Sequence, residues 1–80
     1  RERMAESLLF LKEMYGLESD GITLSVSLSR EEIATLVGTA TETTIRLLSE
    51  FKTKKLLSFD GRKIQIIDTP GLLKIANIHD

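Results

Sequence analysis

The sequence predicts a mainly helical α+β domain, and three patterns support this fold class. Apolar residues recur at helical spacing in four segments, they alternate with polar residues in a fifth, and a hairpin turn signal separates two short apolar runs. The chain has 80 residues, which suits one small domain spanning 1–80 with modest stability. It has no cysteine, which excludes disulfides, thiolate metal sites and a cysteine nucleophile.

The N-terminal part is predicted to hold one helix and one strand. The helix is predicted to end at Gly16, a natural residue for a helix C-terminus. A turn is expected at 19–21, and strict alternation of apolar and polar residues over 22–28 predicts a half-buried strand. The apolar stripe that predicts the helix consists of Met4, Leu8, Leu11 and Tyr15.

Two helices joined by a very short connection are predicted next, over about 29–53. Ser29 with Glu32 forms a capping box that starts the first of them, and Gly38 supplies a turn residue that tolerates positive φ. Thr39 with Glu42 forms a second capping box before a helix over 41–53. Small Ala34 would let the two helices approach closely, and the inward face of the second helix is expected to carry Thr44, Leu47, Leu48 and Phe51.

A β-hairpin and a last short helix complete the chain. The hairpin is predicted over 56–67, with Asp60-Gly61 as its turn. Thr69 is expected to cap the last helix, with Pro70 at its first position. This order of elements is that of a winged helix-turn-helix, in which a three-helix core carries a β-hairpin wing.

Threonines are concentrated where the second helix of the pair begins. Four of them lie between 39 and 44, although threonine is a mediocre helix former. Hydroxyls at a helix N-terminus can donate to phosphates, so Thr41 and Thr43 suit a DNA surface while Thr39 caps the helix. Thr44 points inward, and its hydroxyl is expected to bond to the carbonyl of Ala40. The alternative is that the cluster simply begins an ordinary helix, for which one capping threonine would suffice.

The formal net charge of −1 conceals an asymmetry along the chain. Residues 1–40 carry four basic and seven acidic side chains, whereas residues 41–74 carry seven basic and four acidic ones. This favours one face that meets a polyanion, and the alternative is scattered solvated charge.

The segments 28–48 and 56–64 resemble the DNA-binding domain of Crp/Fnr-type bacterial transcription regulators. The resemblance is carried by LSREEIA followed by VGTATETTIRLL, and it continues through LLS and DGRKI. The resemblance covers nearly the whole chain. It implies sequence-specific DNA binding, with the helix over 41–53 as the recognition helix in the major groove and the wing on the DNA backbone.

The resemblance also implies roles for individual residues. Glu42 and Arg46 occupy the positions that read base edges, although a pair at this spacing can also be a surface salt bridge, and Glu42 can act as a capping acid. Thr41 and Ile45 depart from the family pattern on the same face, and Ile45 can touch a thymine methyl or another protein. Phosphate contacts are implied for Ser29, Arg30, Thr43 and Arg62, with Gly61 at the wing tip. Lys63 is added on charge grounds, and a solvated role is the alternative.

The chain is expected to be a fragment, because it begins with Arg1 and its first methionine is Met4. The resemblance implies a missing N-terminal sensor domain that would bind a small effector, a cyclic nucleotide or another molecule, while this domain needs no cofactor and no metal. The expected partners are double-stranded DNA, a second copy in a homodimer and RNA polymerase, in the cytoplasm and without a membrane.

An enzyme is not expected from this sequence. There is no phosphate-binding glycine loop and no metal-ligand cluster, and the single histidine, His79, lies next to the C-terminus. The competing hypothesis is a winged-helix module that binds protein instead of DNA.

Overall fold

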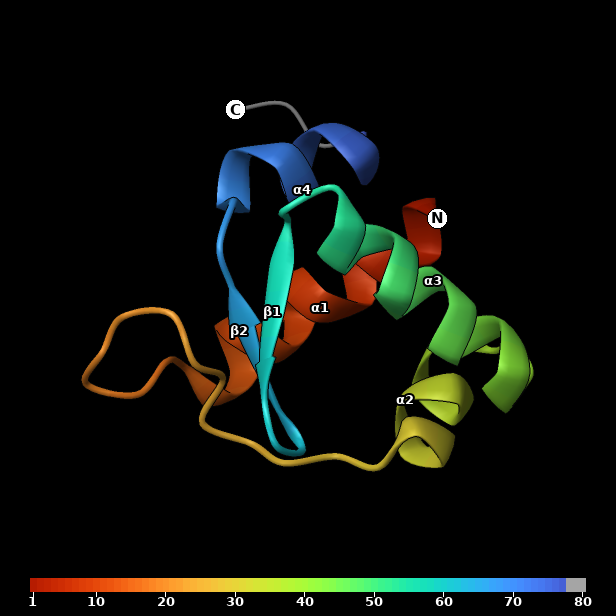
Figure 1. Ribbon diagram of the computed structural model, residues 1–80, viewed down its shortest axis with the longest axis horizontal. Coiled ribbons are helices and arrows are strands. Elements are labelled where there is room, and N and C mark those ends of the chain that lie inside the picture. The colour runs from red at the N-terminus through yellow and green to blue at the C-terminus, as the bar shows by residue number, and fades with distance from the viewer. Residues whose placement is uncertain (78–80) are drawn as a thin grey trace.

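The computed structural model describes residues 1–77, so His79 and Asp80 lie outside the described residues. Figure 1 shows helices grouped around a two-stranded hairpin, with α2 and the hairpin tip on one side and α4 on the opposite side. No helix within 1–77 combines the length and the apolar character needed to cross a membrane. In chain order the elements are α1 (Glu2–Tyr15), α2 (Arg30–Val37), α3 (Thr41–Thr53), β1 (Leu57–Asp60), β2 (Lys63–Ile66) and α4 (Thr69–Ile75).

The core forms between α1, α2, α3 and the hairpin, with α4 closing one end. The predicted inward face of α3 is confirmed, because Thr44, Leu47, Leu48 and Phe51 are all buried. The predicted stripe of α1 is correct at three of its four positions, and Tyr15 is the exception at 51 % exposed. Tyr15 is the last helical residue before Gly16, so it extends beyond the part of α1 that packs against the core.

The hairpin agrees with the predicted turn. β1 and β2 pair antiparallel, with Asp60 opposite Lys63, so the loop consists of Gly61 and Arg62. Gly61 has φ 62°, a left-handed conformation that glycine adopts without a steric cost and that suits a two-residue hairpin loop. This geometry places Arg62 at the tip of the wing.

The predicted strand over 22–28 is wrong. Only isolated bridges form there, with Leu24 donating to the carbonyl of Ile64 at 2.9 Å and Ile66 donating to the carbonyl of Ile22 at 2.7 Å. The carboxylate of Asp20 accepts hydrogen bonds from the backbone N–H groups of Ile22 and Thr23, which holds the chain in a turn at the start of the segment. Beyond residue 25 the chain leaves β2 and runs below the hairpin to reach α2 (Figure 1).

Two predicted helix starts also need correction. Ala40, not Thr39, precedes α3, and no side chain caps that helix, so the second predicted capping box is wrong. The N–H of Thr39 instead donates to the carbonyl of Ala34 at 3.0 Å, which closes the C-terminal end of α2. In α4 the cap is Asp68, whose carboxylate accepts from the N–H of Gly71 at 3.0 Å. Thr69 and Pro70 are therefore the first and second helical residues.

The hydroxyl of Thr44 does not make its predicted bond. The side chain is fully buried, and its oxygen finds no hydrogen-bond partner among residues 1–77. The expected acceptor, the carbonyl of Ala40, receives the backbone N–H of Thr44 at 3.0 Å but not its hydroxyl, whereas the hydroxyls of Thr35 and Thr53 do bond to the carbonyls four residues before them. A valine-shaped threonine therefore fills the core position here while one polar atom remains unsatisfied.

Candidate nucleic-acid interface

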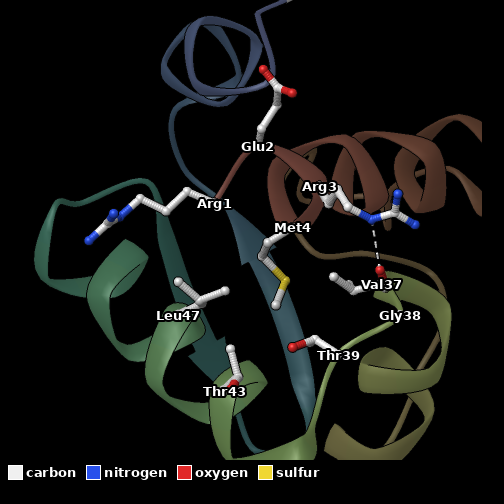
Figure 2. Close-up of a pocket in the computed structure, with 9 residues that line it drawn as sticks. All are labelled: Arg1, Glu2, Arg3, Met4, Val37, Gly38, Thr39, Thr43 and Leu47. Carbon is white, nitrogen blue, oxygen red and sulfur yellow. Dashed lines mark hydrogen bonds between the residues drawn. The ribbon is translucent and has the colours of Figure 1, made fainter.

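The turn between α2 and α3 sets the direction in which α3 points. Gly38 has φ 84° in the left-handed region, and its N–H donates to the carbonyl of Ala34 at 2.8 Å. Ala34 is buried where the two helices meet, as the sequence predicted. The Nε of Arg3 donates to the carbonyl of Val37 at 3.0 Å, so α1 also holds the end of α2 (Figure 2). The turn leaves the outward side of α3 free.

The four predicted base-contacting residues lie together on that outward side. Glu42, Ile45 and Arg46 are exposed and Thr41 is half-buried, whereas the opposite side of the helix lies in the core. The charged groups of Glu42 and Arg46 form no ion pair with each other within 4.0 Å. The alternative of a helix-surface salt bridge between them is therefore not seen, and both charges remain available for other partners.

The predicted phosphate contacts at the start of α2 have structural roles as well. The hydroxyl of Ser29 accepts from the N–H of Glu32 at 3.0 Å, and the N–H of Ser29 donates to Oε1 of Glu32 at 2.8 Å, which confirms the first capping box. The backbone bond from Ser29 is the main cause that lowers the pKa of Glu32. The side chain of Ser29 is the second cause of this lowered pKa. Next to it, the guanidinium of Arg30 lies over the ring of Phe59.

Thr43 faces a different direction from the base-contacting set. Its side chain lines an open pocket of about 350 Å³ between the start of α1, the α2–α3 turn and α3. Figure 2 shows Thr39 and Thr43 in this pocket, with Arg1 on one side and Arg3 on the other. Arg1 is already paired, because its Nη2 donates to Oε1 of Glu50 at 2.9 Å. The sequence patterns gave no signal for these two arginines.

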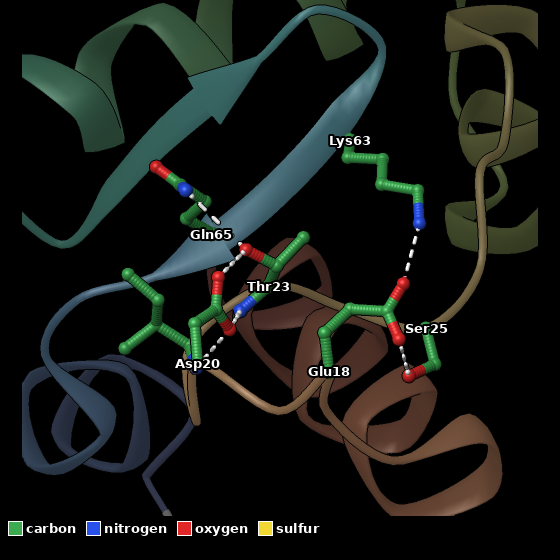
Figure 3. Close-up of polar contacts among 7 residues, drawn as sticks. Glu18, Asp20, Thr23, Ser25, Lys63 and Gln65 are labelled. Atoms are coloured by element: carbon green, nitrogen blue, oxygen red, sulfur yellow. Dashed lines mark hydrogen bonds and ion pairs between the residues drawn. The ribbon is translucent and has the colours of Figure 1, made fainter.

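The wing carries the remaining predicted phosphate contacts. Arg62 is exposed at its tip and close enough to the start of α2 to contribute to the lowered pKa of Glu32, after the Ser29 bonds. Lys63 is engaged elsewhere, since its ammonium lies 2.6 Å from Oε1 of Glu18. Figure 3 shows Glu18 bonded to both Lys63 and Ser25, and the hydrogen bond from Lys63 is the main cause that lowers the pKa of Glu18. A lowered carboxylate pKa means that this ion pair stabilises the fold at neutral pH and is lost as the pH falls through the lowered value.

Among residues 1–77, several cations near α2, α3 and the wing have no carboxylate oxygen within 4.0 Å of their nitrogen atoms. Within residues 1–77, none of the recorded ion pairs involves Arg30, Arg46, Lys52 or Arg62. No cluster of ligating side chains that could hold a metal ion occurs in the same part of the chain. The surface therefore offers cations and hydroxyl groups, the chemistry that binds phosphate and base edges.

A helix-turn-helix with an exposed polar second helix and a basic hairpin beside it defines the winged-helix class of DNA-binding domain. The sequence profile described as the Crp-like helix-turn-helix domain matches residues 2–75. The chain belongs to this family of domains from transcription regulators.

Curated relatives agree with this assignment. The transcriptional regulatory protein btr of Bordetella pertussis is 35 % identical over 75 residues, which are 92 % of this chain and 31 % of that protein. The global nitrogen regulator of a Nostoc species is 35 % identical over 65 residues, which are 80 % of this chain and 29 % of that protein. The chain thus spans about a third of the length of these relatives, which are regulators and not enzymes.

Solved structures share the fold. A transcriptional regulator of the CRP/FNR family from Thermus thermophilus superposes with a TM-score of 0.84 at 31 % identity, covering 95 % of this chain and 39 % of that one. FixK2 from Bradyrhizobium japonicum gives a TM-score of 0.79 at 31 % identity, covering 92 % of this chain and 36 % of that one. The winged helix-turn-helix fold predicted from the sequence is therefore confirmed.

Replacing Glu18 by glutamine is expected to strengthen binding to random-sequence duplex DNA. The change releases the ammonium of Lys63, which can then contact a phosphate. One additional phosphate contact steepens the dependence of log K on log salt concentration by about 0.9. Fluorescence anisotropy at several salt concentrations measures this slope.

Glu13→Gln is the matched control for the Glu18 variant, because it changes the net charge equally on the exposed side of α1. Adding Lys63→Ala to Glu18→Gln should remove the gain. An equal gain from both glutamine variants would mean that Lys63 does not reach the DNA.

Proposed function

We propose that the chain binds double-stranded DNA in a sequence-specific manner, as the DNA-binding module of a Crp/Fnr-type transcription regulator. In this proposal α3 enters the major groove and the wing lies on the sugar-phosphate backbone. The observation that carries the proposal is the outward face of α3, where Glu42 and Arg46 stand one turn apart, exposed and without an ion pair between them.

The side chains on that face suit the chemistry of base edges. An arginine such as Arg46 can donate two hydrogen bonds to O6 and N7 of guanine, and a glutamate such as Glu42 can accept from the amino group of cytosine. Ile45 is 51 % exposed, which leaves it free to contact a thymine methyl group. Thr41, in the first turn, adds a short hydroxyl. Together they give a helix that distinguishes one base sequence from another.

Phosphate contacts would fix the position of α3 in the groove. Ser29 and Arg30 supply them from the start of α2, Thr43 from α3 and Arg62 from the wing. Lys63 would join them only when its ammonium is released from Glu18. Contacts from three elements to the backbone set the register of a helix without reading sequence. The unpaired state of Arg30 and Arg62 within residues 1–77 supports this role.

The whole regulator is proposed to be a cytoplasmic homodimer that binds two half-sites, because two-fold protein symmetry matches a pseudo-palindromic operator. Its effector, a cyclic nucleotide or another small molecule, would bind a separate N-terminal domain. RNA polymerase is its proposed further partner. A single domain should bind weakly, since it makes half of the contacts.

Binding of random-sequence duplex at increasing salt concentration tests the proposal. Counterion release requires phosphate contacts, so the logarithm of the wild-type binding constant should fall linearly with the logarithm of the salt concentration. Arg30→Ala should make this slope shallower by about 0.9. Arg30 is a better target than Ser29, because loss of the Ser29 hydroxyl would also remove the cap of α2. Lys74→Ala is the control, since α4 lies opposite the wing tip (Figure 1).

A protein-binding module is the second candidate, and the exposed Ile45 on α3 is the observation that favours it. It would be supported if the folded chain and an enforced dimer both failed to bind duplex at low salt.

A further inference from the structure

Phe59 brings together side chains from three separate elements. It lies in β1 of the wing, with the guanidinium carbon of Arg30 at 5.0 Å from its ring centroid and the ammonium of Lys52 at 5.7 Å. Arg30 is the first residue of α2, and Lys52 is in the last turn of α3. Both distances fall within the range of about 6 Å in which a cation is attracted to an aromatic ring.

The ring itself is fixed by the fold. Phe59 is half-buried and packs against the hydrophobic core, and its strand partner is Ile64 in β2. A side chain held in this way presents its ring at a constant position. The two basic side chains benefit most from such a fixed partner, because long basic side chains lose considerable rotamer freedom when they are ordered.

An aromatic ring orients a cation without neutralising it. The contrast lies within the same wing, where the carboxylate of Glu18 pairs with Lys63. Arg30 and Lys52 form no ion pair within residues 1–77. A guanidinium carries five N–H donors, so contact with a ring on one side leaves donors for another acceptor.

We propose that Phe59 is a positioning residue for DNA binding, which holds the guanidinium of Arg30 where it contacts a phosphate. This inference rests on the proposed function. It assigns Phe59 a role beyond filling space in the wing, since the ring reduces the side-chain freedom that Arg30 would otherwise lose on binding. It also connects the wing to the start of α2 through a charge that stays available to the DNA.

Substitution of Phe59 by leucine and by tyrosine distinguishes the effect of the aromatic ring from the effect of apolar side-chain volume. Phe59→Leu keeps an apolar side chain and should weaken binding to random duplex by about two- to fivefold, the factor expected for an exposed cation–π contact. It should also reduce the salt slope, because Arg30 reaches the phosphate less often. Phe59→Tyr keeps the ring and should bind as the wild type does. Thermal unfolding of each variant measures whether the fold is retained.

A double-mutant cycle with Arg30→Ala tests whether Phe59 acts through Arg30. The loss caused by Phe59→Leu should be smaller in the Arg30→Ala background than in the wild type. Equal losses in both backgrounds, or an unchanged affinity of Phe59→Leu, would overturn the proposal. A purely structural role of Phe59 would give the first of these results.

A measurement on the free wild-type protein does not depend on any variant folding. Side-chain protons of Arg30 that lie over the ring of Phe59 should resonate upfield of their usual positions in NMR spectra. Ordinary resonance positions would overturn the positioning role even if the chain binds DNA. An upfield shift together with no salt-dependent binding of duplex would mean that the contact exists while the proposed function fails.

Discussion

Replacing Phe51 by alanine is expected to lower the free energy of unfolding by about 3–5 kcal/mol, the usual cost of removing a buried aromatic ring. Phe51 is fully buried on the inward face of α3 and belongs to the hydrophobic core. A domain of this size has a total stability of about 4–12 kcal/mol, so the variant should be marginally stable or unfolded. Urea unfolding followed by circular dichroism measures the change.

Ser49→Ala is the matched control for the Phe51 variant, because Ser49 is exposed on the same helix. Surface substitutions of this kind change stability by about 0.5 kcal/mol or less. If Phe51→Ala unfolded at the same urea concentration as the wild type, the ring could not be the centre of the core. The comparison matters for function, because α3 is held in place by the same face that Phe51 occupies.

Replacing Arg46 by alanine is expected to remove about 1–3 kcal/mol of discrimination between the preferred base pair and its alternatives. The reason is the loss of a side chain on the outward face of α3 that can donate two hydrogen bonds to one guanine. Selection of binding sites from a random pool gives the preferred sequence of the wild type. Affinities of both proteins for that sequence, and for versions with one guanine changed, then measure the loss.

Arg46→Lys is the informative companion of the alanine variant. It keeps the positive charge but not the planar fork, so binding to random duplex should be retained while discrimination falls. An alanine variant that selected the same sites with the same preference would exclude Arg46 from base reading. A loss of affinity that is equal for all sequences would make Arg46 a phosphate contact instead.

The helices and the hairpin could be predicted because their signals are local. Helical spacing identifies the buried face of α3, and Asp60-Gly61 identifies the hairpin turn. The segment over 22–28 was mispredicted because alternation reports which side chains are buried and says nothing about hydrogen-bond partners. Pairing with β2 is limited to the single bridge of Thr23 with Gln65, and the path of the chain toward α2 decides where it ends.

The sequence predicts which residues belong to the candidate site but not the side-chain contacts among them. Its outward face follows from the helical period, whereas the contacts of Arg30 with Phe59 and of Lys63 with Glu18 join residues far apart in the sequence. The cap of α3 was misplaced by one residue because the N–H of Thr39 closes the preceding helix, which is a matter of turn geometry. Motif spacing does not contain this information.

The hydrogen bond from Arg3 to the carbonyl of Val37 has a mechanical consequence. It fastens the first turn of α1 to the last residue of α2, and the bond from Arg1 to Glu50 fastens the same end of α1 to α3. A tilt of α3 relative to α1 would have to break one of these links. These links add to the buried core in resisting such a tilt, so we expect the three helices to move as one body if α3 enters a groove.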